Sequence, residues 1–287
     1  MLACAMALWF AALLGLVQGL TEFIPVSSTA HLRVIPALVG QRDPGSAYTA
    51  VIQFGTLAAV IVYFAKDLVN VTTAMVRAPG TPEGRLPWLL AVGTLPIVIA
   101  GLLLKKRIET DFRSLYVIAV ALVAIGVAMW AIDRQADGRR GIDGLTLRDA
   151  LLVGLAQTLA LVPGVSRSGA TICMALLLGF ARSDAARFSF LLSIPAVAGA
   201  GILEAPKAFR ELGSDALAPI LVGISVAFVV GYLTIAWLIR WLGTHHLVGF
   251  AAYRVVLGLA LIGGLAANWL AEFSPEPGPP ASSERER

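Results

Sequence analysis

The sequence predicts an all-α polytopic membrane protein with about six transmembrane helices and two re-entrant, broken helix pairs, arranged as an inverted-topology repeat. Hydrophobic residues make up 58% of its 287 positions and charged residues only 14%, and the mean hydropathy is +0.82. A soluble domain with a polar shell is less apolar than this, so we expect the chain to lie in a bilayer. Two apolar blocks, 2–39 and 150–180, are interrupted by Pro and polar residues, which predicts the broken pairs.

Uninterrupted apolar runs supply the predicted spans, because each is long enough to cross the roughly 30 Å hydrocarbon core of a bilayer as a helix. They lie near 48–65, 86–104, 115–132, 188–203, 216–239 and 247–271. The loop 66–87, the basic turn 105–113 and the polar connector 133–149 lie between them. We expect the Asp and Glu residues of these connectors to face water and to take no part in a site.

The chain is predicted to form one membrane domain, 1–272, with repeat halves of about 1–135 and 148–272. The remaining residues, 273–287, are rich in Pro and mixed charges. Such a segment cannot bury enough apolar area to offset its conformational entropy, so a disordered tail is predicted.

The basic residues predict membrane anchoring and not nucleic-acid binding. The net charge is +4 and the pI is 9.3, but the Lys and Arg residues sit in the connections without interleaved aromatics. Arg254 is counted with these membrane-flanking residues. The two faces carry too similar a number of Lys and Arg residues to fix the orientation by the positive-inside rule.

The first interrupted block places a set of polar residues around Pro25, namely Gln18, Glu22, Ser27, Ser28, Thr29 and His31. A helix over 5–24 is expected to end before Pro25, because the residue preceding Pro disfavours the helical conformation. The hydroxyl residues that follow suit the N-cap of a short helix over 28–39. Neither helix spans a bilayer alone, so a re-entrant pair is predicted. Burying these polar groups is costly unless they pair or hold a ligand, which makes the break a predicted site.

The second interrupted block repeats the first in part. The sequence separation between Gln18 and Gln157 equals that between Ser27 and Ser166. In each block a Pro lies between the Gln and the Ser. Three predicted spans separate the blocks, and this odd number brings the second block in from the opposite face. The breaks of such an inverted repeat converge near the middle of the membrane.

Both breaks suit an anion, because each presents the free N–H groups and partial positive charge of a helix N-terminus. Arg167 adds a permanent charge that can grip phosphate bidentately. Gly164 and Gly169 allow close backbone approach, and further hydroxyl donors come from Ser166, Ser168 and Thr171. These residues predict a phosphate-sized pocket. A structural ion pair between Arg167 and Glu22 is the alternative, and a bound phosphate can share both residues.

The first break adds acid–base chemistry. Gln18 and Glu22 share one helical face, and Ser28 and His31 share a face of the next helix. Glu22 can accept a proton, bind a divalent cation or position water. His31 can activate a hydroxyl or protonate a leaving group.

Two motifs carry a resemblance to a known family. Residues 18–22 read Gln-Gly-Leu-Thr-Glu and lead into Pro-Val-Ser-Ser-Thr-Ala-His, and residues 163–171 read Pro-Gly-Val-Ser-Arg-Ser-Gly-Ala-Thr. At these positions, and in its spans over essentially 5–271, the chain resembles the undecaprenyl-diphosphate phosphatase family of bacterial membrane enzymes, the BacA/UppP type. The resemblance implies hydrolysis of undecaprenyl (C55 isoprenyl) diphosphate to undecaprenyl phosphate and inorganic phosphate, which recycles the lipid carrier of peptidoglycan synthesis. It also implies a multi-pass protein of the bacterial cytoplasmic (inner) membrane, a site open to the outer face, and a link to bacitracin resistance.

The resemblance also implies residue roles. The family's principal catalytic positions correspond to Glu22, Ser28, His31 and Arg167. Substrate-binding positions correspond to Gln18, Ser27, Thr29, Ser166, Ser168 and Thr171, and Gly164 joins them through its place in the predicted pocket. The family needs a divalent cation, so Mg²⁺ or Ca²⁺ is expected. Because the motif begins with Gln18 and not Glu, Mg²⁺ would depend on Glu22, diphosphate oxygens and water.

The hypothesis for the reaction is in-line displacement at the terminal phosphorus, with Ser28 attacking and His31 as its base. The sequence does not separate this from attack by water or by His31 itself. A transporter or flippase of a phosphorylated lipid is the rival function, because broken helices in inverted repeats are typical of transporters. An anion channel is disfavoured since no ring of charges is identifiable. A homodimer is compatible with the sequence, which does not fix the oligomeric state.

Overall fold

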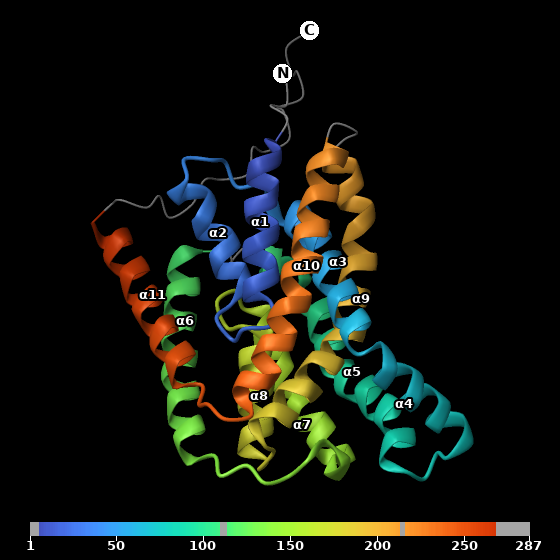
Figure 1. Cartoon of the computed structure of the whole chain (residues 1–287). Coiled ribbons are helices and arrows are strands. Elements are labelled where there is room, and N and C mark those ends of the chain that lie inside the picture. Colours follow the sequence, from blue (N-terminus) through green and yellow to red (C-terminus); the bar gives the residue numbers. More distant parts are fainter. Residues whose placement is uncertain (1–5, 110–113, 213–215, 268–287) are drawn as a thin grey trace, which may run out of the picture.

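The computed structural model describes residues 6–109, 114–212 and 216–267, and within these ranges the chain is helical and forms no strand (Figure 1). Its α-helices are α1 (Leu8–Thr21), α2 (Ser28–Leu38), α3 (Gly45–Tyr63), α4 (Ala65–Arg77), α5 (Pro82–Glu109), α6 (Leu115–Gln135), α7 (Leu147–Thr158), α8 (Arg167–Leu177), α9 (Arg182–Leu212), α10 (Leu217–Leu242) and α11 (Val248–Ala266). Short 3-10 turns cover Ile142–Gly144 and Leu159–Leu161.

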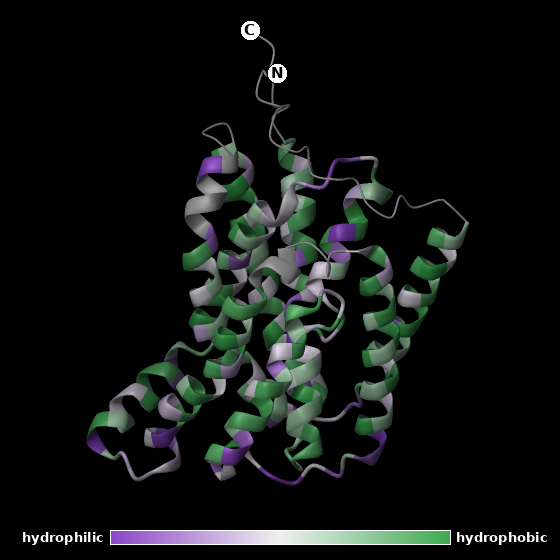
Figure 2. Ribbon diagram, turned by 180° about the vertical axis from the view of Figure 1, so that it is seen from behind, coloured by the Kyte–Doolittle hydropathy of each residue, from purple (hydrophilic) through white to green (hydrophobic). Residues whose placement is uncertain are grey.

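The predicted number of spans is confirmed for the described residues, where six helices are long and apolar enough to cross a bilayer. These are α3, α5, α6, α9, α10 and α11. Figure 2 shows hydrophobic residues along most of their length and hydrophilic residues gathered in the connections at the two ends. Large apolar side chains such as Leu103 and Val256 are exposed, as expected for a surface that faces lipid and not water.

One predicted loop is partly helical. Within 66–87 the chain forms α4, which packs against α5 at one end of the molecule (Figure 1). Leu68 and Val71, three positions apart, give α4 one apolar side, and Leu68 packs on the main hydrophobic core. The Pro79-Gly80 step then separates α4 from α5.

The two interrupted blocks form the expected broken pairs. Figure 1 places α1 and α2 in one half of the molecule and α7 and α8 in the other, with both breaks near the middle. The first helix ends at Thr21, earlier than the predicted 24, because turns cover the residues before Pro25. The predicted tail, 273–287, lies outside the described residues.

Both short helices begin at a serine with unusual backbone geometry. Ser27 and Ser166 have φ values of 76° and 71°, and the described chain contains no other non-Gly residue with positive φ. Each serine side chain caps its helix by accepting the N–H three residues ahead, from Ala30 and Gly169 respectively. This shared conformation supports the predicted repeat, whose symmetry stays a prediction.

The expectation that connector carboxylates face water is wrong for Asp133 and Asp149, which are both buried. Asp133 accepts a hydrogen bond from Arg182 Nε at 2.6 Å and one from the N–H of Leu247 at 2.9 Å. Asp149 pairs with Arg140 at 2.7 Å and forms a capping box with Thr146 at the start of α7. These residues tie the connector to helix ends, a structural role that sequence position alone does not reveal.

Candidate active site

The two breaks meet at a cavity of 290 Å³, which we call the polar cavity. It is lined by residues 160–164 and by Glu22, Ser27, Ser28, Thr29, Gln53, Ile97, Ser166, Arg167, Ala196, Val197 and Ala200. The first residues of α2 and α8, Ser28 and Arg167, both lie in this wall, so two helix N-termini begin at one cavity. Such ends favour an anion through their free N–H groups.

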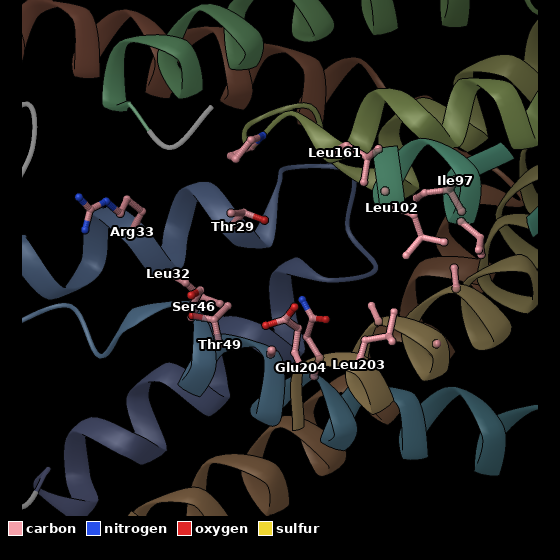
Figure 3. A pocket seen from close by; sticks show the side chains of 18 of the residues that line it. Thr29, Leu32, Arg33, Ser46, Thr49, Ile97, Leu102, Leu161, Leu203 and Glu204 are labelled. Atoms are coloured by element: carbon pink, nitrogen blue, oxygen red, sulfur yellow. The ribbon is translucent and has the colours of Figure 1, made fainter. Parts of the chain in front are cut away.

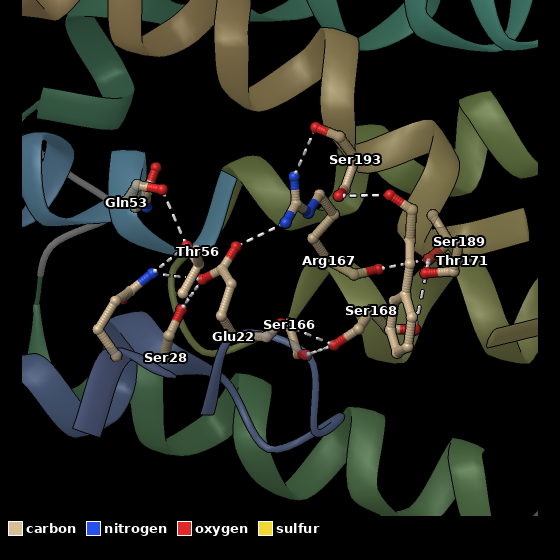
Figure 4. A network of polar contacts seen from close by, with 12 residues as sticks. Glu22, Ser28, Gln53, Thr56, Ser166, Arg167, Ser168, Thr171, Ser189 and Ser193 are labelled. Carbon is tan, nitrogen blue, oxygen red and sulfur yellow. Dashed lines mark hydrogen bonds and ion pairs between the residues drawn. The ribbon is translucent and has the colours of Figure 1, made fainter. Parts of the chain in front are cut away.

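Glu22 joins the two breaks (Figure 4). Its Oε1 accepts a 2.6 Å hydrogen bond from Arg167 NH2, and this contact is also an ion pair. Its Oε2 accepts from Gln18 Nε2 at 3.0 Å and from the Ser28 hydroxyl at 2.7 Å. The predicted ion-pair alternative therefore exists in the structure, but it forms in the cavity wall, where a phosphate can share both partners.

The position of Arg167 follows from its place at the start of α8. Its guanidinium reaches across to Glu22 and donates through NH1 to the carbonyl of Ser193 at 3.3 Å. The side chain is 13% exposed and lines the polar cavity. Arg167 can thus turn toward a bound anion without leaving its support on α9 (Figure 4).

The other predicted binding residues fall into two groups. Ser27, Thr29, Gly164 and Ser166 line the polar cavity, whereas the structure does not place Gln18, Ser168 and Thr171 in its wall. Gly164 has a φ of 98°, and a Cβ there would meet the carbonyl oxygen of Ile118, so Gly is required at this turn.

The predicted binding residues that lie outside the wall of the polar cavity support the wall residues through hydrogen bonds. Ser168 Oγ lies 3.1 Å from Ser166 Oγ and donates to the carbonyls of Glu22 and Ile24 at 3.3 and 3.4 Å, which links the two breaks. Thr171 bonds to Ser189 Oγ at 2.6 Å and fixes α8 on α9. Gln18 supports Glu22 and also donates to Thr56 at 3.3 Å.

His31 lies apart from this network. Its Nδ1 is 2.7 Å from the carbonyl oxygen of Ser27, and because a carbonyl only accepts, Nδ1 carries a proton. Its Nε2 is 2.7 Å from the hydroxyl of Tyr253 on α11, with the two rings stacked. No hydrogen bond joins His31 to Ser28 in the described structure, and His31 does not line the polar cavity. The predicted Ser28–His31 pair is therefore replaced by a Ser28–Glu22 pair.

Sequence reasoning missed Arg254, which was counted with the membrane-flanking residues and is in fact fully buried. It donates to the carbonyl of Pro25 at 3.0 Å and to those of Gly164 and Val165 at 2.7 and 2.9 Å. A signal was present, because a lone Arg within a predicted span is itself a mark of function. Tyr253, Thr56 and Ser193 had no such signal, since each is a single polar residue in an apolar helix.

The described residues offer few protein ligands for the expected divalent cation. No group of three or more His, Cys, Asp or Glu side chains able to hold a metal ion occurs among the described residues. Glu22 is the carboxylate in the cavity wall, and Arg167 already engages one of its oxygens. A divalent cation at this wall would therefore need further ligands besides the Glu22 carboxylate, as Mg²⁺ often takes from substrate phosphates and water.

A larger cavity of 490 Å³, which we call the apolar cavity, lies beside the polar one. The two share wall residues, including Thr29, Gln53, Ile97, Leu161 and Pro163. Figure 3 shows apolar side chains such as Leu102, Leu161 and Leu203 along its wall, with Arg33, Ser46, Thr49 and Glu204 also lining it. A ligand with a charged head and a hydrocarbon tail can therefore occupy both cavities at once.

Comparisons with known proteins agree with this geometry. The model of the family described as bacitracin resistance protein BacA matches residues 11–260. A protein of Myxococcus xanthus (strain DK1622) named undecaprenyl-diphosphatase is 48% identical over 275 residues, covering 94% of this chain and 93% of its own. Relatives of the same name from Chlorobaculum tepidum and Nocardioides sp. are each 47% identical, covering 90% and 88% of this chain and 96% and 94% of their own. The chain therefore belongs to the BacA family of bacitracin resistance proteins.

Proposed function

We propose that this chain is a membrane undecaprenyl-diphosphatase, which hydrolyses undecaprenyl diphosphate to undecaprenyl phosphate and inorganic phosphate. The observation that carries the proposal is the convergence of Glu22, Ser28 and Arg167 at the polar cavity. This function recycles the lipid carrier of peptidoglycan synthesis, accounts for a link to bacitracin resistance and belongs to the bacterial cytoplasmic membrane. Both broken pairs come from one chain, so a homodimer is compatible with the activity and is not required for it.

The substrate fits the two cavities in one orientation. The diphosphate occupies the polar cavity, where Arg167 and the N-termini of α2 and α8 face its charge. The isoprenyl chain extends into the apolar cavity and from there between the helices to the lipid.

The chemical step is proposed as an in-line displacement. Ser28 Oγ attacks the terminal phosphorus, the bond to the bridging oxygen breaks, and undecaprenyl phosphate leaves. Glu22 Oε2, 2.7 Å from Ser28 Oγ, takes the hydroxyl proton. Water then attacks the phosphoserine, Ser28 recovers its proton from Glu22, and inorganic phosphate is released. His31 holds the turn at Ser27 through its Nδ1 bond and acts on this reaction by positioning.

The expected divalent cation, Mg²⁺ or Ca²⁺, fits this scheme as a partner of the substrate. Glu22 would supply the protein's carboxylate ligand, and the cation would neutralise charge on the diphosphate oxygens. The proton transfers above use only the side chains of this chain.

The test is phosphate release by purified protein in detergent, with undecaprenyl diphosphate as substrate and a titration of Mg²⁺ and Ca²⁺. We expect turnover by the native chain and a loss of about 10²–10³-fold or more in Arg167→Ala. Arg77→Ala, on the exposed last turn of α4, is the matched control and should keep full activity. A flippase would release no phosphate in detergent, so absence of turnover by the native chain would refute the proposal.

Rapid quench and mass spectrometry separate attack by Ser28 from attack by water. A phosphoserine at Ser28 within one turnover supports attack by the side chain. Direct attack by water, with Glu22 as base, would leave the protein unmodified at every time point.

A further inference from the structure

Arg254 occupies a position that the proposed chemistry does not use. It lies on α11 and is completely buried, yet it contacts the break of each half of the molecule. One terminal nitrogen, NH1, donates to the carbonyl of Pro25 in the first break. The other, NH2, donates to the carbonyls of Gly164 and Val165 in the second break. The two arms of one guanidinium thus join the two breaks.

These acceptors are close to the reacting groups along the chain. Pro25 precedes the Ser27 cap and Ser28, and Val165 precedes the Ser166 cap and Arg167. A Cβ built on Gly169, in the first turn of α8, would lie 3.5 Å from Arg254 NH1. Arg254 therefore contacts the two turns that place Ser28 and Arg167 at the polar cavity.

The chemistry of the contact explains the residue type. The guanidinium is planar and rigid, so the spacing of its arms sets the spacing of the carbonyls that it binds. A Lys side chain carries the same charge but a single nitrogen, so it cannot reproduce this geometry. None of the ion pairs in the described structure involves Arg254, and a buried charge without a carboxylate is costly. The hydrogen bonds that Arg254 donates to the carbonyls of both breaks offset that cost.

We propose that Arg254 is a positioning residue that holds the two breaks in register, so that Ser28 and Arg167 face the same phosphoryl group. The inference rests on the proposed phosphatase activity and deepens it. Arg254 acts through the backbone of the two turns and does not touch the substrate. Loosening this link should reduce the rate of the chemical step more than the affinity for substrate, because misplacement of reacting groups by about 1 Å costs about 10²-fold in rate.

The test compares Arg254→Lys with Arg182→Lys in purified full-length protein, by phosphate release from undecaprenyl diphosphate. Arg182 is the matched control, because it also donates to backbone carbonyls, those of Asp133 and Ala136, but lies at the connector end of α9. We expect Arg254→Lys to lower kcat about 10²-fold with KM changed less than threefold. Arg182→Lys should keep the native kcat. Circular dichroism and thermal unfolding report the folded fraction of each variant.

Each other outcome contradicts the inference. A native kcat in Arg254→Lys shows that the two-armed link is not needed for the chemical step. If KM is also raised, Arg254 contributes to substrate binding and not to positioning of the reacting groups. If Arg254→Lys and Arg254→Gln both fail to fold while Arg182→Lys folds, Arg254 is a folding residue and not a positioning residue. Failure of the native chain to release phosphate is a different result, since it refutes the proposed function itself.

Discussion

Replacing Glu22 by Gln removes the proposed base while keeping an oxygen that can still accept the Ser28 hydroxyl. The structure places Glu22 Oε2 at 2.7 Å from Ser28 Oγ, whereas both ring nitrogens of His31 have other partners. General-base catalysis contributes about 10²–10⁴-fold, so kcat should fall by that factor, equivalent to about 3–5 kcal/mol in the activation free energy. The substitution also breaks the ion pair with Arg167, so the folded fraction has to be measured in parallel.

The assay is phosphate release at saturating substrate for Glu22→Gln, Ser28→Ala and the double variant. Residues that act as one unit are non-additive, so the double variant should be no slower than Ser28→Ala alone. Glu83→Gln, an exposed carboxylate in the first turn of α5, is the control and should match the native rate. A Glu22→Gln variant that is folded and keeps a kcat within tenfold of native would refute the assignment, and so would additive losses in the double variant.

Three further substitutions test the supporting structure. Tyr253→Phe removes the hydroxyl that bonds His31 Nε2. The kcat should fall about fivefold, which corresponds to a hydrogen bond of about 1 kcal/mol. An unchanged rate would show that His31 needs no support from α11. Gly154→Ala should lower the free energy of unfolding by about 1–3 kcal/mol, because a Cβ there would overlap the carbonyl of Gly93. Gly263→Ala is the control, because a Cβ at that position would have no atom within 4 Å. Equal thermal stabilities of the two variants in detergent would contradict this packing argument. Asp133→Asn breaks the buried ion pair with Arg182 and should destabilise the fold by about 3 kcal/mol, measured by thermal unfolding. The kcat per folded molecule, measured by phosphate release, should not change.

The spans were predictable because a bilayer imposes strict requirements on a chain. A helix that crosses it needs a long apolar run, and the sequence contains such runs at α3, α5, α6, α9, α10 and α11. The breaks were predictable for a local reason, since a Pro followed by hydroxyl residues ends one helix and caps the next. The amphipathic helix α4 was missed because its composition resembles that of a polar loop.

The pairing of side chains was not predictable from spacing alone. Ser28 and His31 share a face of α2 by periodicity, but Ser28 is the first residue of that helix and its hydroxyl turns back to Glu22. His31 instead bonds the Ser27 carbonyl and reaches Tyr253, more than two hundred positions along the chain. Arg254 shows the same limit, because only the packing of α11 against α6 and the breaks reveals which carbonyls it holds.

The ion pair between Glu22 and Arg167 connects binding with chemistry in the proposed reaction. Without substrate, Arg167 is neutralised by Glu22 at 2.6 Å, which avoids an uncompensated charge in the membrane interior. A phosphate that engages Arg167 competes with Glu22 Oε1 for the same N–H groups, while Oε2 stays beside the Ser28 hydroxyl. Binding of the diphosphate thus frees the carboxylate when a proton acceptor is needed. Because Glu22 and Arg167 belong to different breaks, neither broken pair can perform this exchange alone.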